Sequence, residues 1–425
     1  MWAVLGGTFT LRFSTGLTGA MLGVYLAKLP EHGGPEVAAT TLAILHATFY
    51  LSELFLSPLF GILSDRLGHH RVMLFGPVFG AVAVILTGLT TNLFILGGTR
   101  LLEGASTAAS VPSILGYIAL ATAGNELLRG KAAARFEGAT LAGLGVGFAT
   151  APLLFDALGP AAFFLNAVVY GVSFLIYQFG VEDRDREERL AAAAERTGRV
   201  DLGRYAALLR TSHVWLLAPT WIAVNASIGV WFSQSIFQFS KADPRFPDQF
   251  LLQGFSPGQI SLAAVVIGVL FGAGLLYWGD RFKSLRRTTI ILYGILGGGL
   301  LVMAGVAVNH QAGLPVIVPL VAMVMAGFGL FVLAGATPAA LGLLADISER
   351  FPTDRGAIMG LYSVFLAIGQ ITGSLIGGLA ADLRGIDGLL VATFGLLLVA
   401  LLPLAQLRRQ EHYVGGPATP AMIDE

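Results

Sequence analysis

Twelve long apolar segments constrain this chain more than any other feature of its sequence. A helix needs about 20 mostly apolar residues to cross the hydrocarbon core of a membrane. Strands of membrane barrels are shorter, about 10 residues, and alternate apolar with polar side chains. We therefore predict an all-α integral membrane protein. Its 12 predicted transmembrane helices cover roughly residues 3–28, 38–63, 72–91, 93–120, 137–157, 160–180, 213–239, 257–279, 288–308, 314–344, 357–381 and 387–406.

The composition also indicates lipid as the solvent. Charged residues make up 12% of the chain, whereas a soluble domain carries about 25%. The 55 glycines suit membrane helices, because small residues let neighbouring backbones approach closely. The chain has no cysteine, which excludes disulfides, thiolate metal sites and cysteine nucleophiles.

Lysine and arginine are unequally divided between the predicted loops. Of the 26, 20 lie in the loops after even-numbered segments and in the C-terminal tail, and four lie in the loops after odd-numbered segments. Cytoplasmic loops of membrane proteins carry such an excess of basic residues. The distribution predicts that both termini are cytoplasmic and that the protein is a multi-pass protein of the cell membrane, the inner or plasma membrane.

The longest predicted loop divides the segments into six and six. We predict an N-terminal six-helix bundle over residues 1–180, a cytoplasmic linker over 181–212, a C-terminal six-helix bundle over 213–407 and a cytoplasmic tail over 408–425. The linker is dense in both signs of charge, which is typical of a solvated connector. The tail is polar, and such a segment cannot bury enough apolar surface to order itself.

One loop pattern occurs in both halves. An Asp-Arg pair, followed by a further arginine, comes after the second segment and again after the eighth. The matched positions are Asp65 with Asp280, Arg66 with Arg281 and Arg71 with Arg286, at an offset of 215 residues. Matching halves are typical of transporters built from internal repeats, whose substrate path lies between the repeats.

The first of these loops, GILSDRLGHHRV at residues 61–72, resembles the most diagnostic motif of the major facilitator superfamily. That motif is Gly-x-Leu-x-Asp-Arg-x-Gly-x-(Arg/Lys)-(Arg/Lys), between helices 2 and 3. The matching positions are Gly61, Leu63, Asp65, Arg66, Gly68 and Arg71, with His70 in place of one basic residue. In the family the loop locks helix 2 to helix 11 in the outward-open state, so the resemblance implies a conformational-lock motif here and at Asp280, Arg281 and Arg286.

Two further stretches resemble the same family. Arg100 and Gly104 match its Arg-x-x-x-Gly motif in helix 4. The glycine-rich residues 138–154 resemble helix 5 of the drug–proton antiporter members, although their Gly-Pro pair is absent. The resemblance covers essentially the whole chain and implies a fold of two pseudo-symmetric six-helix halves that move substrate by alternating access.

Four ionisable residues lie well inside predicted membrane segments: Arg12, Glu53, Arg100 and Glu103. Each costs about 2.5–3.5 kcal/mol near the centre of a membrane helix, so such residues are functional by default. Glu53 lies 12 residues before Asp65, which places it about 18 Å above the cytoplasmic loop. We predict that the four line a central cavity and couple transport to protons. The alternative is that they form internal salt bridges that only hold the N-terminal half together.

The C-terminal half offers a different surface to such a cavity. Its segments have no charge away from their ends but contain amides and aromatic rings. A cavity between the halves would then have one charged wall and one amphipathic or apolar wall. The candidate substrate contacts are Tyr25, Asn166, Asn225, Trp231, Gln234, Gln238 and Gln370.

These features predict a secondary active transporter that exports an amphipathic or lipophilic small molecule, coupled to protons. A lipid or lysolipid flippase of the same fold and a nutrient importer remain alternatives. The scattered histidines form no metal-ligand or nucleophile–base cluster, which argues against an enzyme or a metal site. The sequence has no Gly-x-x-x-x-Gly-Lys nucleotide loop, so we expect no cofactor and an ion gradient as the driving force. The expected partners are the small-molecule substrate and the lipid bilayer, without nucleic acid, and the chain is expected to be a monomer.

Overall fold

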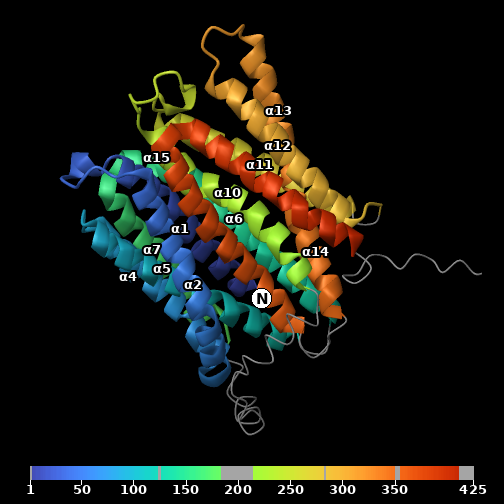
Figure 1. Cartoon of the computed structure of the whole chain (residues 1–425). Helices are drawn as coiled ribbons and strands as arrows, with labels where there is room; N and C mark the ends of the chain where they lie inside the picture. The colour runs from blue at the N-terminus through green and yellow to red at the C-terminus, as the bar shows by residue number, and fades with distance from the viewer. Residues whose placement is uncertain (1, 123–125, 183–213, 282–283, 350–354, 411–425) are drawn as a thin grey trace, which may run out of the picture. The chain divides into compact units, whose positions relative to one another are not determined.

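The computed structural model of the chain (Figure 1) describes residues 2–122, 126–182, 214–281, 284–349 and 355–410. Within these residues the structure consists of α-helices and short 3-10 segments joined by turns, so the all-α prediction is confirmed. The predicted linker and tail fall mostly on residues 183–213 and 411–425, which lie outside the described part.

The chain divides into two compact units. The first comprises Met1–Gly198, Ser233–Ala242 and Gly254–Val265, and the second comprises Arg199–Phe232, Asp243–Gln253 and Val266–Glu425. The helices of the N-terminal segment of the first unit are α1 (Trp2–Ala27), α2 (Ala39–Leu67), α3 (His69–Met73), α4 (Phe75–Gly88), α5 (Leu93–Ala121), α6 (Glu126–Leu158) and α7 (Ala162–Gly180). They are followed by α10 (Ala218–Ser240), α11 (Pro257–Asp280), α12 (Arg287–Asn309), α13 (Ile317–Leu333), α14 (Ala336–Glu349) and α15 (Arg355–Arg409).

Eight stretches of the described helices are long and apolar enough to cross a membrane. Two of them, Ala134–Gly180 and Ser363–Arg409, are 47 residues long, and each covers two of the segments predicted from sequence. The predicted segments outside these stretches are 3–28 and 213–239, which correspond to α1 and α10. Both are helical.

Large apolar side chains dominate the exposed surface of the helices. Phe55, Leu276 and Val324, for example, are 67%, 78% and 73% exposed. A soluble monomer rarely exposes extended apolar surface of this kind. Lipid contact accounts for it.

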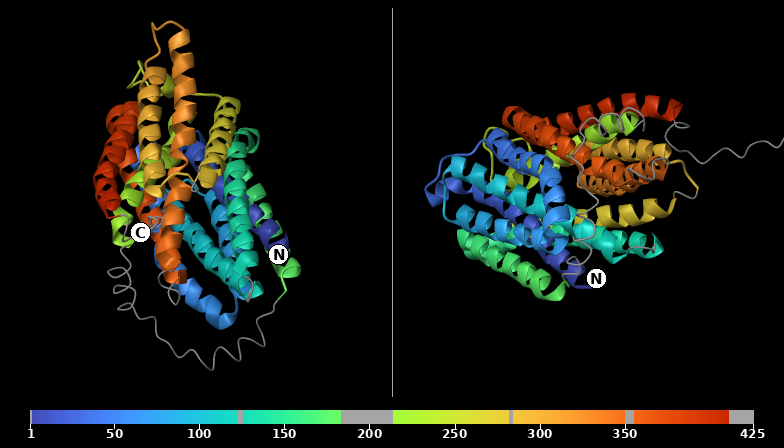
Figure 2. Two further views of the ribbon diagram at one scale, coloured as in Figure 1. Left: turned by 90° about the vertical axis from the view of Figure 1, so that its right-hand side faces the viewer. Right: turned by 90° about the horizontal axis from the view of Figure 1, so that it is seen from below.

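Within the first unit, α1 packs along α6, α2 along α5, and α4 along both α5 and α7. In Figure 2 these helices run from blue to green and lie side by side as a bundle. Glycines allow α1 and α6 to pack closely. A Cβ added at Gly16 would collide with the Leu144 carbonyl, and a Cβ added at Gly147 would collide with the Phe13 carbonyl. Direct contact between backbones is the reason these positions are glycine.

This contact predicts a difference between two glycines of α6. We expect Gly147→Val to destabilise the protein by about 1–3 kcal/mol, because overfilling a packed interface forces the helices apart. Gly145 is the matched control, since no described atom of another helix lies within 4 Å of the position its Cβ would take. We expect Gly145→Val to change stability by about 0.5 kcal/mol or less. Thermal unfolding of both variants in detergent checks this, and equal stability would contradict the close approach of α1 and α6.

In the second unit the core gathers around Trp221 of α10, which is 1% exposed. Ile290 of α12, Leu343 of α14 and Leu404 of α15 belong to the same buried cluster. The apolar faces of four helices thus meet within this unit.

Two long helical stretches of the second unit are each interrupted at a glycine. The segment predicted over 314–344 is two helices, α13 and α14, that meet at a turn around Gly335. A Cβ at Gly335 would lie 2.6 Å from the Trp278 ring, so glycine permits a close approach at this turn.

The second break divides α15 at Arg384 and Gly385, between the predicted segments 357–381 and 387–406. Gly385 has a φ of +61°, a left-handed conformation that favours glycine. Gln249 holds the break: its Nε2 donates to the Arg384 carbonyl at 2.9 Å, and its Oε1 accepts from the Ile386 nitrogen at 2.8 Å.

Candidate functional site

Helix α5 carries a buried ion pair. Arg100 and Glu103 lie one turn apart, and their side chains are 4% and 2% exposed. Arg100 Nη1 donates a hydrogen bond to Glu103 Oε2. The Arg100 guanidinium also lies over the Phe49 ring of α2, 5.0 Å from the ring centroid. Both charges therefore have compensating partners inside the first unit, as burial of ions requires.

Hydroxyl and amide groups from α1 and α7 surround the Glu103 carboxylate. Thr18 and Tyr170 lie beside it and interact with it. Asn166 Nδ2 donates to Thr18 Oγ1 at 2.8 Å and to the Ser14 carbonyl at 3.1 Å. Three helices thus converge on one buried carboxylate.

Several buried polar atoms of this region have no hydrogen-bond partner among the described residues. They are Ser14 Oγ, Arg100 Nε and Asn166 Oδ1. An unsatisfied buried polar group costs about 1–3 kcal/mol, so folded proteins keep few of them. Their concentration around one ion pair marks this region as a candidate functional site.

A second group of charges comes from α1 and α2. Arg12 and Glu53 are both half-buried, and they interact electrostatically across the two helices. Tyr50 of α2 interacts with both of them and with Arg100. The structure therefore brings all four predicted charges into the first unit, as one close pair within α5 and one looser pair between helices.

Glu137 of α6 also interacts with Arg12, and sequence reasoning missed it. Glu137 is the first residue of the predicted segment 137–157, and charged residues are common at the ends of membrane segments. In the structure α6 begins 11 residues earlier, at Glu126, and Glu137 lies inside the long apolar stretch Ala134–Gly180. The signal that could have found it is the acidic residue within RFEGAT, directly before the glycine-rich face of this helix.

The predicted conformational-lock loop forms the end of α2 and the start of α3. Gly61 and Arg66 lie on α2, and Gly68 joins the two helices with a φ of +100°, which requires glycine. Arg66 and Arg71 are exposed. The Asp65 side chain lies outside the described part of the structure.

Two histidines of this loop are buried. His69 Nδ1 lies 3.1 Å from Ser64 Oγ on α2, and His70 Nε2 lies 3.1 Å from the Tyr177 carbonyl on α7. His70, which replaces a basic residue of the family motif, therefore connects the loop to the end of α7.

The repeated loop in the second unit joins α11 to α12. Asp280 is the last residue of α11, and Arg286 precedes the first residue of α12. The Arg281 guanidinium lies over the Tyr277 ring, 4.7 Å from its centroid. These three residues are exposed. Their role as a lock stays a prediction.

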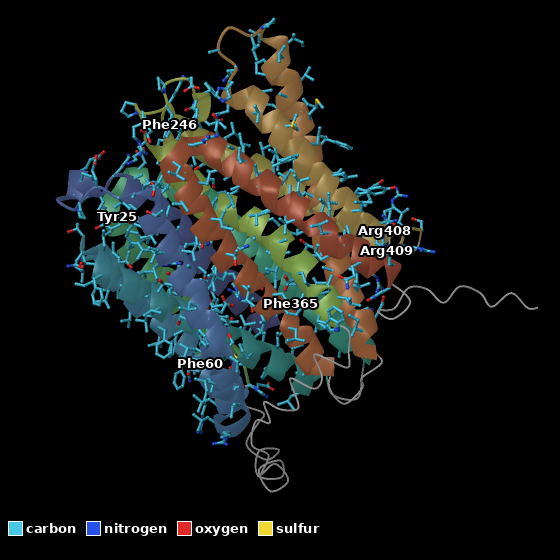
Figure 3. All side chains as sticks on the ribbon, viewed as in Figure 1. Tyr25, Phe60, Phe246, Phe365, Arg408 and Arg409 are labelled. Atoms are coloured by element: carbon cyan, nitrogen blue, oxygen red, sulfur yellow. The ribbon has the colours of Figure 1, made fainter. Side chains whose placement is uncertain are left out.

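Two of the predicted substrate contacts of the first half make internal hydrogen bonds. Tyr25, labelled in Figure 3, donates from its hydroxyl to the Thr90 carbonyl at 2.9 Å and packs edge-on against the Phe163 ring. Asn166 is bonded to Thr18 and Ser14 as described above. Both side chains are fully buried in the first unit.

The other predicted contacts are divided between the units. Gln234 and Gln238 belong to the first unit, where Gln234 Nε2 donates to the Ala39 carbonyl at 3.1 Å. In the second unit, Trp231 Nε1 donates to Thr393 Oγ1 at 2.9 Å, and Asn225 Nδ2 donates to the Trp221 carbonyl at 2.9 Å. Gln370 is 5% exposed, and its Oε1 has no hydrogen-bond partner among the described residues. Contact of these residues with a substrate stays a prediction.

An open groove lies between α4 and α7 in the first unit, away from the charged residues. It is lined by apolar side chains, including Val82, Val168 and Leu175, and by the ring of Tyr170. Its exposed lining suits lipid chains rather than a charged ligand.

A family model described as Major Facilitator Superfamily matches residues 4–332 and 246–421 of the chain. Two similar curated proteins are named for drug resistance. Multidrug resistance protein 2 of Bacillus subtilis (strain 168) is 24% identical over 365 residues, 82% of each chain. Quinolone resistance protein NorA of Staphylococcus aureus (strain MSSA476) is 25% identical over 390 residues, 88% of each chain.

Solved structures of transporters share the fold. The nucleoside transporter NupG superposes with a TM-score of 0.69 at 12% identity, over 96% of this chain and 98% of that one. A mutant of the peptide transporter POT in complex with alafosfalin gives a TM-score of 0.70 at 16% identity, over 98% of this chain and 95% of that one. At these identities the likeness shows the fold alone.

Proposed function

Because the chain belongs to the major facilitator superfamily and is therefore a membrane transporter rather than an enzyme, we propose that it exports an amphipathic or lipophilic small molecule in exchange for protons. The observation that carries the proposal is the set of ionisable side chains within the apolar helices of the first unit: Arg12, Glu53, Arg100, Glu103 and Glu137. Charges kept within membrane helices at such cost are typical of ion and proton pathways.

The names of the relatives support export. One is named a multidrug resistance protein and another a quinolone resistance protein, and both match over more than four fifths of this chain. We propose that this chain likewise removes a lipophilic compound from the cell. The driving force would be a proton gradient, without a bound cofactor.

We further propose 12 membrane crossings with both termini in the cytoplasm. The two 47-residue apolar stretches each hold two crossings, because Gly159 and Gly385, both with positive φ, interrupt them near their middle. α1 and α10 supply the two remaining crossings of this proposal, which puts the positive loops on one side.

A transport assay in proteoliposomes tests the proposed function. The purified chain is reconstituted, and a fluorescent amphipathic dye, a fluorescent lysolipid and a radiolabelled sugar are offered with and without an imposed pH gradient. We expect the dye to move uphill only with the gradient, and a protonophore to stop it. Gradient-independent movement of the lysolipid alone would favour a flippase, and movement of the sugar alone would favour an importer; either result contradicts the proposal.

A further inference from the structure

A loop of the second unit, residues 243–253 between α10 and α11, covers the break in α15. Its side chains Phe246, Gln249 and Leu252 supply the atoms nearest to Gly385, and a Cβ added at that glycine would lie 2.6 to 3.0 Å from them. Figure 3 labels Phe246 in this loop. The loop is therefore in direct contact with the turn that joins the two parts of α15.

His310, directly after α12, lies at the same place with a carboxylate on each side. Its Nε2 lies 2.9 and 3.0 Å from the two carboxylate oxygens of Asp387, which follows the break in α15. Its Nδ1 lies 3.6 Å from Asp248 Oδ2 of the loop. The preceding residue, Asn309, donates from Nδ2 to Asp387 Oδ1 at 2.9 Å and accepts at Oδ1 from the Leu251 nitrogen at 3.1 Å. One imidazole thus connects α12, α15 and the loop.

The two ring nitrogens of His310 depend differently on its charge. The neutral tautomer that carries its proton on Nε2 still donates to Asp387, whereas only the protonated ring carries a proton on both nitrogens. A separation of 3.6 Å is too long for a hydrogen bond, so the attraction between Nδ1 and Asp248 is electrostatic. In the neutral ring a lone pair on Nδ1 faces the Asp248 carboxylate instead. The contact with the loop is therefore the one that protonation controls.

Water reaches the groups that titrate. His310 and Asp248 are 36% and 68% exposed. Arg245 of the loop is paired with Asp243, at 2.6 Å between Nη2 and Oδ2, so its charge is balanced within the loop. The other charged side chains at the turn in α15 are Asp382 and Arg384. Histidine changes its charge between about pH 5 and pH 8. The charge of His310 therefore follows the pH of the water at this end of the second unit.

We propose that His310, Asp248 and Asp387 form a pH-sensitive clasp, which fastens the loop 243–253 over the break in α15 when His310 is protonated. In the topology proposed above, with 12 crossings and cytoplasmic termini, the loop and the break lie at the outer face of the membrane. The clasp therefore closes at acidic external pH and loosens as the external pH rises. It is a regulatory device of the second unit, separate from the charged residues of the first, and only its sidedness rests on the proposed topology.

Cysteine labelling tests the clasp, because the chain has no cysteine of its own. Leu252→Cys places a thiol at a buried position against the break, since Leu252 is 2% exposed. Pro247→Cys places one at an exposed position of the same loop. The ratio of their rates with a maleimide in detergent corrects for the rise of thiolate reactivity with pH. We expect this ratio, Leu252→Cys over Pro247→Cys, to be about two- to fivefold higher at pH 8 than at pH 5.5, as for loss of one exposed ion pair.

Three variants assign the pH dependence to the clasp. Asp248→Asn changes an exposed side chain and should give the same ratio at both pH values, at the level that the parent shows at pH 8. His310→Gln should do the same. His32→Gln is the matched control, because His32 is an exposed histidine between α1 and α2 in the first unit, and it should keep the parent's pH dependence. A parent ratio that does not change with pH, or an unchanged pH dependence in Asp248→Asn, would overturn the clasp.

Right-side-out membrane vesicles test its sidedness. A membrane-impermeant maleimide is added outside, the external pH is varied, and the internal pH is held at 7. We expect the labelling ratio to follow the external pH as it does in detergent. Labelling that ignores the external pH would overturn the inference. If Pro247→Cys is not labelled from outside, the proposed topology is wrong, and external sensing fails with it. Proton-coupled dye transport is measured separately in proteoliposomes, so its failure would leave the clasp standing.

Discussion

Glu53→Gln is expected to abolish proton-driven accumulation of the substrate while sparing substrate binding and downhill exchange. Glutamine mimics the protonated acid, so the variant can move between its states but cannot carry a proton. Glu53 is the stronger candidate because its cationic neighbour Arg12 lies on another helix, and helix movement can separate the two. Glu103 keeps Arg100 on its own helix, one turn away.

The measurement compares uphill and downhill dye transport in the same proteoliposomes. Glu36→Gln serves as the control, because Glu36 is an exposed acid in the loop between α1 and α2 and should transport as the wild type does. If Glu53→Gln still concentrates the dye against its gradient, the proton carrier is another group, and Glu103 is the next candidate.

Arg100→Ala is expected to cost about 3–5 kcal/mol of stability, because it leaves the Glu103 charge buried without its partner. The Arg100 side chain is 4% exposed, and the substitution also removes its contact with the Phe49 ring. The double variant Arg100→Ala/Glu103→Ala should recover part of the loss, since no stranded charge remains.

Thermal unfolding in detergent checks this order of stabilities. Arg408→Ala is the control, because Arg408 lies exposed at the end of α15 (Figure 3) and its removal should cost little. Equally mild effects at Arg100 and Arg408 would mean that Arg100 faces water and is not held by Glu103.

The fold was largely predictable because its main determinant is local. Length and apolarity of each segment do not depend on the rest of the chain, and the motif at residues 61–72 lies within one loop. The break between α13 and α14 was not predictable, because Gly335 sits in a continuous apolar run. The Trp278 ring that lies against this glycine belongs to α11, a different helix.

For the candidate site, too, interactions within one helix could be predicted and interactions between helices could not. Arg100 and Glu103 could be paired from sequence, because a spacing of three residues on a helix fixes their proximity. The electrostatic interaction of Glu137 with Arg12 could not be predicted, because it depends on how α6 lies along α1. Sequence also cannot show that the Tyr25 hydroxyl is already bonded to the Thr90 carbonyl, since these groups are 65 residues apart.

The ion pair within α5 has an electrical consequence. Moving one elementary charge through a membrane potential of 100 mV changes the free energy by about 2.3 kcal/mol. Arg100 and Glu103 leave the same helix one turn apart, so they travel together and their charges sum to zero. Membrane voltage therefore does no net work on these two buried ions when they move together. The potential acts instead on the transported proton and on charges whose electrostatic partners stand on other helices, such as Arg12, Glu53 and Glu137.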